Sequence, residues 1–292
     1  MLSLVVAFAL ASALLQSLSD VIQHKAIFSG SGTDMSAGAL GRLFKNKLWL
    51  LGLAIIVVGF LFQALALGIG QLVMVQTILV SMLVWVLIFA VLIEKVRLTR
   101  LEYLGSAPVV IGLVAFVLVV RPSSPGNVVD AVGWAIAGGA TLVACIGLIL
   151  LGQKLKPGPA AAVIGSAAGL INGLAAGLTA VSLIVLQKDG IPALATNWLL
   201  YATIAALLLG VLFPIWAFQA GPVTASMPPL IVFNPALAYV LGILLLDEKI
   251  HETTLDIVVI CAAWVLMIAG ILVLSRSKVI AAEFADTEEV VR

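Results

Sequence analysis

Long apolar runs follow one another along almost the whole chain, and they limit it to one kind of fold. Each run has close to the ~20 residues that a helix needs to cross ~30 Å of hydrocarbon. We count nine such runs, at 2–24, 48–68, 71–93, 102–120, 131–151, 159–186, 197–219, 222–246 and 254–275. The linkers between them are short and rich in Pro and Gly. The pattern predicts an all-α integral membrane protein with about nine transmembrane helices.

Composition supports a chain surrounded by lipid. Hydrophobic residues make up 63% of it and charged residues 10%, against roughly 45–50% and about 25% in a soluble domain. Cys145 and Cys261 lie inside apolar runs and are expected to be small core residues. Because no Cys or His cluster has metal-ligand spacing and no nucleophile–base pair is visible, we expect no metal, no cofactor and no enzyme activity. The net charge of +1 makes nucleic acid an improbable partner.

One apolar stretch occurs twice. Leu83-Val84-Trp85-Val86-Leu87 … Ile93-Glu94-Lys95-Val96 is answered 154 residues later by Leu237-Ala238-Tyr239-Val240-Leu241 … Asp247-Glu248-Lys249-Ile250, and Gly68 and Met74 match Gly221 and Met227 at a spacing of 153. The duplication predicts two unequal repeats of four and five spans, 1–125 and 126–278, followed by a cytoplasmic tail at 279–292. In the first repeat, the polar, Gly-rich segment 26–47 takes the place of a fifth span. The matching segments face opposite ways, which is typical of inverted-repeat transporters.

The distribution of Lys and Arg predicts the orientation. With the C-terminus inside, twelve cationic residues fall on the cytoplasmic side and three, Arg121, Lys188 and Lys249, on the other. The positive-inside rule therefore predicts a multi-pass protein of the cell membrane with the N-terminus outside and the C-terminus in the cytoplasm.

The second repeat resembles the drug/metabolite transporter superfamily in its EamA-like branch. The residues that carry the likeness are Phe218-Gln219-Ala220-Gly221-Pro222-Val223-Thr224-Ala225-Ser226, Phe233-Asn234-Pro235 and Gly242 to Lys249. The first half is similar to NIPA-type magnesium transporters, through Gln63 to Gly68, Gln76-Thr77, Glu94 and Arg121-Pro122, although relatives commonly carry Pro where Thr77 stands. The resemblance implies transport by alternating access, without identifying the cargo.

Asp20 is the most informative single residue. Gln16, Asp20 and Gln23 recur at i, i+4 and i+7, on one face of the first span. Because a carboxylate deep in a span costs about 2.5–3.5 kcal/mol, it normally faces a cavity or a partner. Two hypotheses stay open: Asp20 binds a coupling proton or cation, or it pairs with His24 or Lys25 near the interface and anchors the helix.

Uncharged polar residues of both repeats could line a neutral central cavity. In any single case the alternative is a hydrogen bond between helices, worth on average ~0.6 kcal/mol. Aromatic residues could wall the cavity or simply pack in the core, and Trp49, Trp134 and Trp198, at span ends, are expected to be interface anchors. The proposed substrate-binding set is Gln16, Asp20, Gln63, Gln76, Thr77, Trp85, Asn172, Trp216, Asn234 and Tyr239.

Three further patterns concern helix geometry. Gly165, Gly169, Gly173 and Gly177 form a smooth stripe that predicts close helix packing and a sliding contact. Prolines are expected to break the eighth span, at Pro228, Pro229 and Pro235. Glu94 and Glu248 close matching helices beside Lys and could be gates, although such a carboxylate is more typical of a solvated or capping group.

The sequence favours a secondary transporter that exports a small organic metabolite or drug-like solute, within the lipid bilayer and with proton or cation coupling. A magnesium or divalent-cation transporter is the second hypothesis, although hard cations prefer several carboxylate ligands. A non-transporting membrane subunit or lipid-flippase accessory is the third. Homodimerisation stays open.

Overall fold

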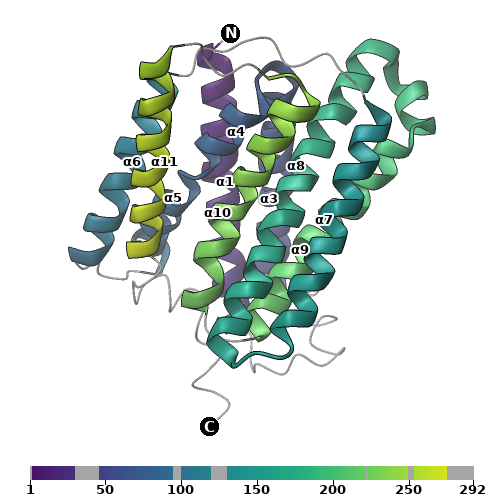
Figure 1. Ribbon diagram of the computed structural model, residues 1–292. Coiled ribbons are helices and arrows are strands. Elements are labelled where there is room, and N and C mark those ends of the chain that lie inside the picture. The colour runs from purple at the N-terminus through teal and green to yellow at the C-terminus, as the bar shows by residue number, and fades with distance from the viewer. Residues whose placement is uncertain are drawn as a thin grey trace.

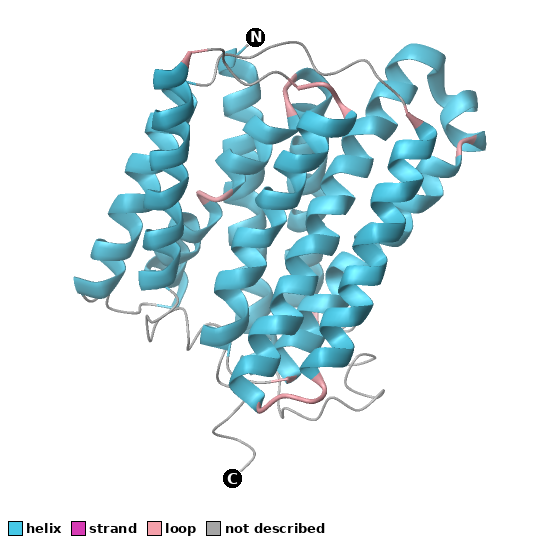
Figure 2. Cartoon of the chain, viewed as in Figure 1, coloured by secondary structure: helices cyan, strands magenta, loops and turns pink. Residues whose placement is uncertain are grey.

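The computed structural model describes residues 2–29, 46–94, 100–119, 130–220, 223–248 and 253–274. All the regular structure in these ranges is helical, as Figure 2 shows, and the helices are joined by short turns. The helices are α1 (Leu2–Ser29), α3 (Lys47–Ile69), α4 (Leu72–Leu79), α5 (Met82–Phe89), a π-helical turn η1 (Ala90–Glu94), α6 (Arg100–Val119), α7 (Ala131–Gly152), α8 (Pro157–Thr196), α9 (Trp198–Gln219), α10 (Val223–Leu245) and α11 (Thr254–Leu274).

Six segments of the described chain are long and apolar enough to cross a membrane: Leu2–Ser19, Lys47–Ile69, Leu72–Ile93, Ala131–Gly152, Gly158–Thr196 and Thr254–Val273. Three shorter apolar helical segments lie within α6, α9 and α10. The expectation of an all-α membrane protein is confirmed at this level. The predicted tail at 279–292 lies outside the described residues, as does 30–45, most of the predicted polar segment 26–47.

Several of the helices have side-chain caps at their first turn. Asn46 Oδ1 accepts from the Leu48 N–H at 2.9 Å at the start of α3, and Asn197 Oδ1 accepts from the Leu199 N–H at 3.0 Å at the start of α9. Asp130 plays the same part for α7. Such caps satisfy backbone N–H groups that have no partner within the helix. The helix α4 differs, because its N-cap residue Gln71 makes no side-chain capping bond.

The helix α8 occupies the centre of the bundle. Of the residues in its span, 72% are buried inside the molecule, against 17% for α7, 22% for α3 and 28% for α11. It packs along α9 and α10 and also contacts α7, α3 and α4. Gly190 has φ 80° and marks a kink near its end, between the predicted runs 159–186 and 197–219.

The other helices form two further groups (Figure 1). The helices α6 and α11 stand side by side at the left edge, and α1 packs along α3 and reaches α4 and α5. The α6–α11 pair is antiparallel and close, since a Cβ at Gly112 would lie 2.6 Å from the Ala263 carbonyl oxygen and one at Gly270 would lie 2.5 Å from that of Gly105.

The span predicted at 71–93 is not one continuous helix. It divides at Val80–Ser81, where the Val80 and Ser81 N–H groups donate to the carbonyls of Thr77 and Ile78, three residues back. Hydrogen bonds of this kind tighten the helix into a 3₁₀ turn. Ser17 Oγ, on α1, donates to the Met82 carbonyl at 2.9 Å and so supports the chain just after the break.

The expected interruption of the eighth span is not seen. The helix α10 continues from Val223 to Leu245 through Pro228, Pro229 and Pro235. Each proline lacks an N–H and removes one hydrogen bond of the helix, but the neighbouring turns keep helical geometry. Within the described residues, a break lies instead in the first half, between α4 and α5, at a site without proline.

Candidate functional site

The predicted polar residues of α1 and α3 bind each other. Gln16 Nε2 donates to Gln63 Oε1 at 3.1 Å and to Ser12 Oγ at 2.7 Å. Gly59 leaves room for this pair, since a Cβ there would lie 3.0 Å from Gln16 Cγ. Gln16 and Gln63 therefore join two helices.

Asp20, on α1, belongs to the same predicted face. Its backbone is helical, but its side chain lies outside the described residues, so both hypotheses for its role stay open.

Gln76 and Thr77 lie on α4, just before the break, and both are buried. Thr77 Oγ1 donates to the Val73 carbonyl at 2.8 Å. Gln76 Nε2 and, at the break itself, Ser81 Oγ are buried atoms that have no hydrogen-bond partner within the described part of the chain. Leaving such a group unpaired costs about 1–3 kcal/mol, so these two atoms are ready to bind water or a ligand.

The two asparagines of the second half differ in the same way. Asn172 Nδ2, on α8, donates to the Ala168 carbonyl at 2.9 Å and to the Gly210 carbonyl of α9 at 3.2 Å, so it joins two helices. Asn234 lies on α10, and its Oδ1 is buried without a hydrogen-bond partner among the described residues. At the 153-residue spacing that separates Met74 from Met227, Asn234 is aligned in sequence with Ser81.

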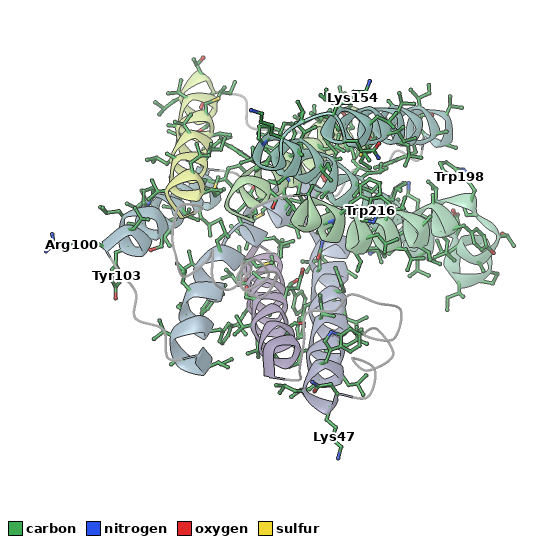
Figure 3. All side chains as sticks on the ribbon, turned by 90° about the horizontal axis from the view of Figure 1, so that it is seen from below. Lys47, Arg100, Tyr103, Lys154, Trp198 and Trp216 are labelled. Carbon is green, nitrogen blue, oxygen red and sulfur yellow. The ribbon has the colours of Figure 1, made fainter. Side chains whose placement is uncertain are left out.

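The predicted aromatic residues lie in different surroundings. Trp85 and Tyr239 are half-buried, and Tyr239 meets Trp264 of α11 edge to face with ring centroids 5.8 Å apart. Trp216 is 44% exposed and stacks on Phe213 at 5.2 Å. In the view from below, Trp216 lies near the middle of the molecule, whereas Lys47, Arg100, Lys154 and Trp198 lie toward its periphery (Figure 3). Trp216 therefore stays a candidate wall residue.

Trp134 was expected at the membrane interface, and that expectation is wrong. Its side chain is fully buried on the first turns of α7. Its ring rests against Gly177 of α8, where a Cβ would lie 3.0 Å from a ring atom. The absent side chain at Gly177 makes the space into which the indole packs.

The glycine stripe of α8 faces α10. A Cβ at Gly169 would lie 2.6 Å from the Leu230 carbonyl oxygen, and one at Gly173 would lie 2.5 Å from that of Asn234. Gly165 meets the Ser226 backbone, and Gly177 meets Leu241 as well as Trp134. The residue numbers of the contacting positions increase together along α8 and α10. The two helices therefore run parallel, and their backbones lie close together.

Glu248 is the residue whose role the sequence did not disclose. It follows α10, is 4% exposed, and accepts hydrogen bonds from the N–H groups of Leu72 at 2.5 Å and Val73 at 3.0 Å. It therefore caps α4, a helix of the other half, and is buried rather than solvated. Burial raises the pKa of Glu248 to about 6, and the two backbone N–H groups act in the opposite direction.

A signal for this arrangement exists in the sequence but is weak. Gly242 lies where a Cβ would come 2.6 Å from Glu248 Oε2, so only glycine leaves space for the carboxylate. The partner groups, however, are backbone N–H groups, which no side-chain motif marks.

Among the described residues, no group of three His, Cys, Asp or Glu side chains is placed to hold a metal ion. The polar groups that the described helices bring to their interior are mainly amides and hydroxyls. This arrangement can hydrogen-bond a neutral or zwitterionic molecule.

Comparison with known proteins gives one informative relative. The chain is 27% identical over 285 residues to an uncharacterized protein of Corynebacterium glutamicum, an alignment that covers 94% of this chain and 96% of the relative. No protein-family model and no solved structure matches the chain.

The described helices define the class of protein, which is an all-helical protein with several segments suited to a membrane.

Proposed function

We propose that this protein is a secondary transporter of the drug/metabolite transporter superfamily, which exports a small organic solute by alternating access. The observation that carries the proposal is the set of buried, unpaired polar atoms in matching helices of the two repeats: Gln76 Nε2, Ser81 Oγ and Asn234 Oδ1. Gln76 and Ser81 lie at or beside the break between α4 and α5. Asn234 lies on α10, the helix that matches α4 and α5 in the proposed repeat. Broken helices border the binding site in many secondary transporters.

Nine spans are part of this proposal. The six long apolar segments and the three shorter ones in α6, α9 and α10 together make that number. At the repeat spacing of 154 residues, α1 falls on α8, α3 on α9, α4 and α5 on α10, and α6 on α11. The antiparallel packing of α6 on α11 suits an inverted pair.

The helix without a counterpart is then α7. Segment 26–47 falls on 180–201, the end of α8 and the start of α9. We propose that segment 26–47 corresponds to a connection between helices in the second half, in place of the missing span expected from the sequence. The packing agrees, since α1 lies along α3 as α8 lies along α9.

The orientation is proposed from charge. Lys47, Arg100 and Lys154 stand at the beginning of α3, the beginning of α6 and the turn after α7. Figure 1 places these three points at the lower end of the bundle, opposite the start of α1. The positive-inside rule makes this end cytoplasmic, with the first helix beginning outside.

The substrate is proposed to be amphipathic or zwitterionic and of low net charge. Amide and hydroxyl groups can bind such a molecule without a charged partner, and the half-buried rings of Trp85 and Tyr239 offer apolar surface. A hydrogen bond to the ligand at Asn234 is worth about 1 kcal/mol, or close to a fivefold change in affinity.

Asn234→Ala and Asn172→Ala form a matched test of the binding site. Both variants remove an asparagine amide from the second half. Asn172 Nδ2 already donates to two carbonyls, whereas Asn234 Oδ1 has no hydrogen-bond partner among the described residues. In proteoliposomes screened with a panel of metabolites and drug-like compounds, Asn234→Ala is expected to lower flux about fivefold or more at subsaturating solute. Asn172→Ala is expected to lower the melting temperature while flux per folded molecule is kept. Equal flux in wild type and Asn234→Ala would remove Asn234 from the site.

A further inference from the structure

The contact between Glu248 and the start of α4 joins residues that are 175 and 176 positions apart in the chain. Two N–H groups of one helix end point at the two oxygens of one carboxyl group, with Leu72 on Oε1 and Val73 on Oε2. Since the N-cap residue of α4 makes no side-chain capping bond, Glu248 supplies the cap from outside. The helix dipole favours the carboxylate here, as the two N–H groups do, but the burial that raises the pKa is the larger effect.

The chain around Glu248 is shaped to deliver the side chain to this place. Asp247 has φ 51°, a left-handed conformation that ends α10 and reverses the chain. The Glu248 N–H then donates to the Gly242 carbonyl at 2.9 Å. Leu246, between them, is 1% exposed. The turn is therefore closed over the start of α4 in this structure.

Few charged groups surround the carboxyl group. The helix α4 carries no titratable side chain, and α10 carries only Tyr239. Asp247 is exposed beside it, Asp130 begins α7 near Leu245, and Asp256 is on the first turn of α11, bonded to Thr253. Lys249, His251 and Glu252 lie outside the described residues. Burial is the leading cause that raises the pKa of Glu248, and the hydrogen bonds from the Val73 and Leu72 N–H groups lower it.

We infer that Glu248 is a proton-carrying gate: its carboxyl group closes one end of the pathway when it docks on the start of α4, and it enters water when the two halves separate there. The inference rests on the proposed alternating access, and it names the coupling site of that cycle. Below about pH 6, where the docked group is protonated, opening breaks the carboxyl O–H bond and the proton passes to water. Closing then takes up one proton from water.

The direction of the pH effect follows from linkage. The docked carboxyl has a pKa of about 6, against 4.5 for the free group, so the closed state binds the proton more tightly. Lower pH therefore favours closure, and the opening equilibrium rises with pH, most steeply below about pH 6, and levels off above about pH 7. The full difference corresponds to about a 30-fold change in the opening equilibrium.

Accessibility of a cysteine at Leu246 measures opening directly. Leu246→Cys is made in a background with Cys145→Ala and Cys261→Ala, and the protein in lipid nanodiscs reacts with a water-soluble maleimide between pH 4.5 and 7.5. Each rate is divided by the rate of the same cysteine in Glu248→Gln protein, which removes the pH dependence of the thiol. The ratio is expected to rise about tenfold or more over this range, with most of the rise below pH 6.

Two variants keep the test sharp. Asp247→Asn changes the adjacent exposed carboxylate and suits the left-handed conformation, so it should keep the wild-type profile. Gly242→Ala adds a Cβ in the space of Glu248 Oε2 and should raise labelling at every pH, which tests the gate even if Glu248→Gln does not fold.

A flat labelling ratio, or a profile lost equally in Asp247→Asn, would overturn the gate. Labelling needs no solute, so the two proposals can fail separately. Solute flux with a flat ratio would leave transport in place and remove Glu248 as the gate, whereas a rising ratio without flux of any solute would refute transport and keep the proton-linked contact.

Discussion

Gly173→Ala should separate the two parallel helices at the centre of the molecule. The new Cβ would lie 2.5 Å from the Asn234 carbonyl oxygen, about 0.9 Å closer than the 3.4 Å at which ordinary contact begins. The obstacle is backbone on both sides, so α8 and α10 must move apart. Overpacking of this kind costs about 1–3 kcal/mol, whereas alanine in place of glycine returns about 1 kcal/mol of helix propensity. The net expectation is a loss of up to about 2 kcal/mol.

Gly147→Ala is the matched control. Gly147 lies inside α7, and a Cβ there would meet nothing within 4 Å, so only the propensity gain of about 1 kcal/mol remains. The two variants should therefore move the melting temperature in detergent in opposite directions, with a difference of about 1–3 kcal/mol in stability. Equal shifts in the two proteins would show that α8 and α10 do not approach as closely as the structure has them.

Three other variants and reactions test separate parts of the fold. Gly190→Ala should lower stability by about 1–2 kcal/mol, since its φ of 80° is left-handed, and this can be read as a drop in melting temperature. Gln63→Leu removes the acceptor of the Gln16 amide and should cost about 0.6 kcal/mol, at most ~1.7; an unchanged melting temperature would refute the link. Cys261 is exposed and Cys145 buried, so a lipid-soluble maleimide should label one thiol per folded chain and two after denaturation, as counted by mass spectrometry.

The approximate positions of the apolar helices could be predicted from the spacing of apolar residues, because each helix must satisfy its backbone hydrogen bonds within the segment. The ends of the helices were predicted less accurately. The helix α8 continues to Thr196 beyond the run predicted to end at 186, since a short helical turn follows the Gly190 kink. The break at Val80–Ser81 could not be predicted, because its residues include neither Gly nor Pro, and Ser17, which donates to the Met82 carbonyl just after it, belongs to another helix.

The polar residues were found as a set but could not be sorted. Nothing in the sequence separates Asn172, whose amide binds two carbonyls, from Asn234, whose oxygen has no hydrogen-bond partner among the described residues. That difference is decided by which backbone groups lie opposite each side chain. The same reason explains Glu248: the adjacent Lys249 favours a solvated group, and the N–H groups that bind it belong to a helix about 175 residues away.

The prolines gave the opposite error. Three of them predict an interrupted α10, yet α10 is continuous and an interruption lies between α4 and α5. Proline removes a donor and a hydrogen bond, but surrounding contacts can hold the helix straight through that loss. Packing of α10 along the glycine stripe of α8 supplies such contacts.

Transport by the purified protein is the central claim, and flux in proteoliposomes tests it most directly. The protein is reconstituted alone, a pH gradient is imposed, and a panel of zwitterionic and amphipathic solutes, with Mg²⁺ as a separate arm, is followed in both directions. We expect saturable flux of at least one organic solute, which is faster with the gradient than without it, and no flux in protein-free vesicles. Flux of Mg²⁺ alone, or no solute flux from stably folded protein, would contradict it.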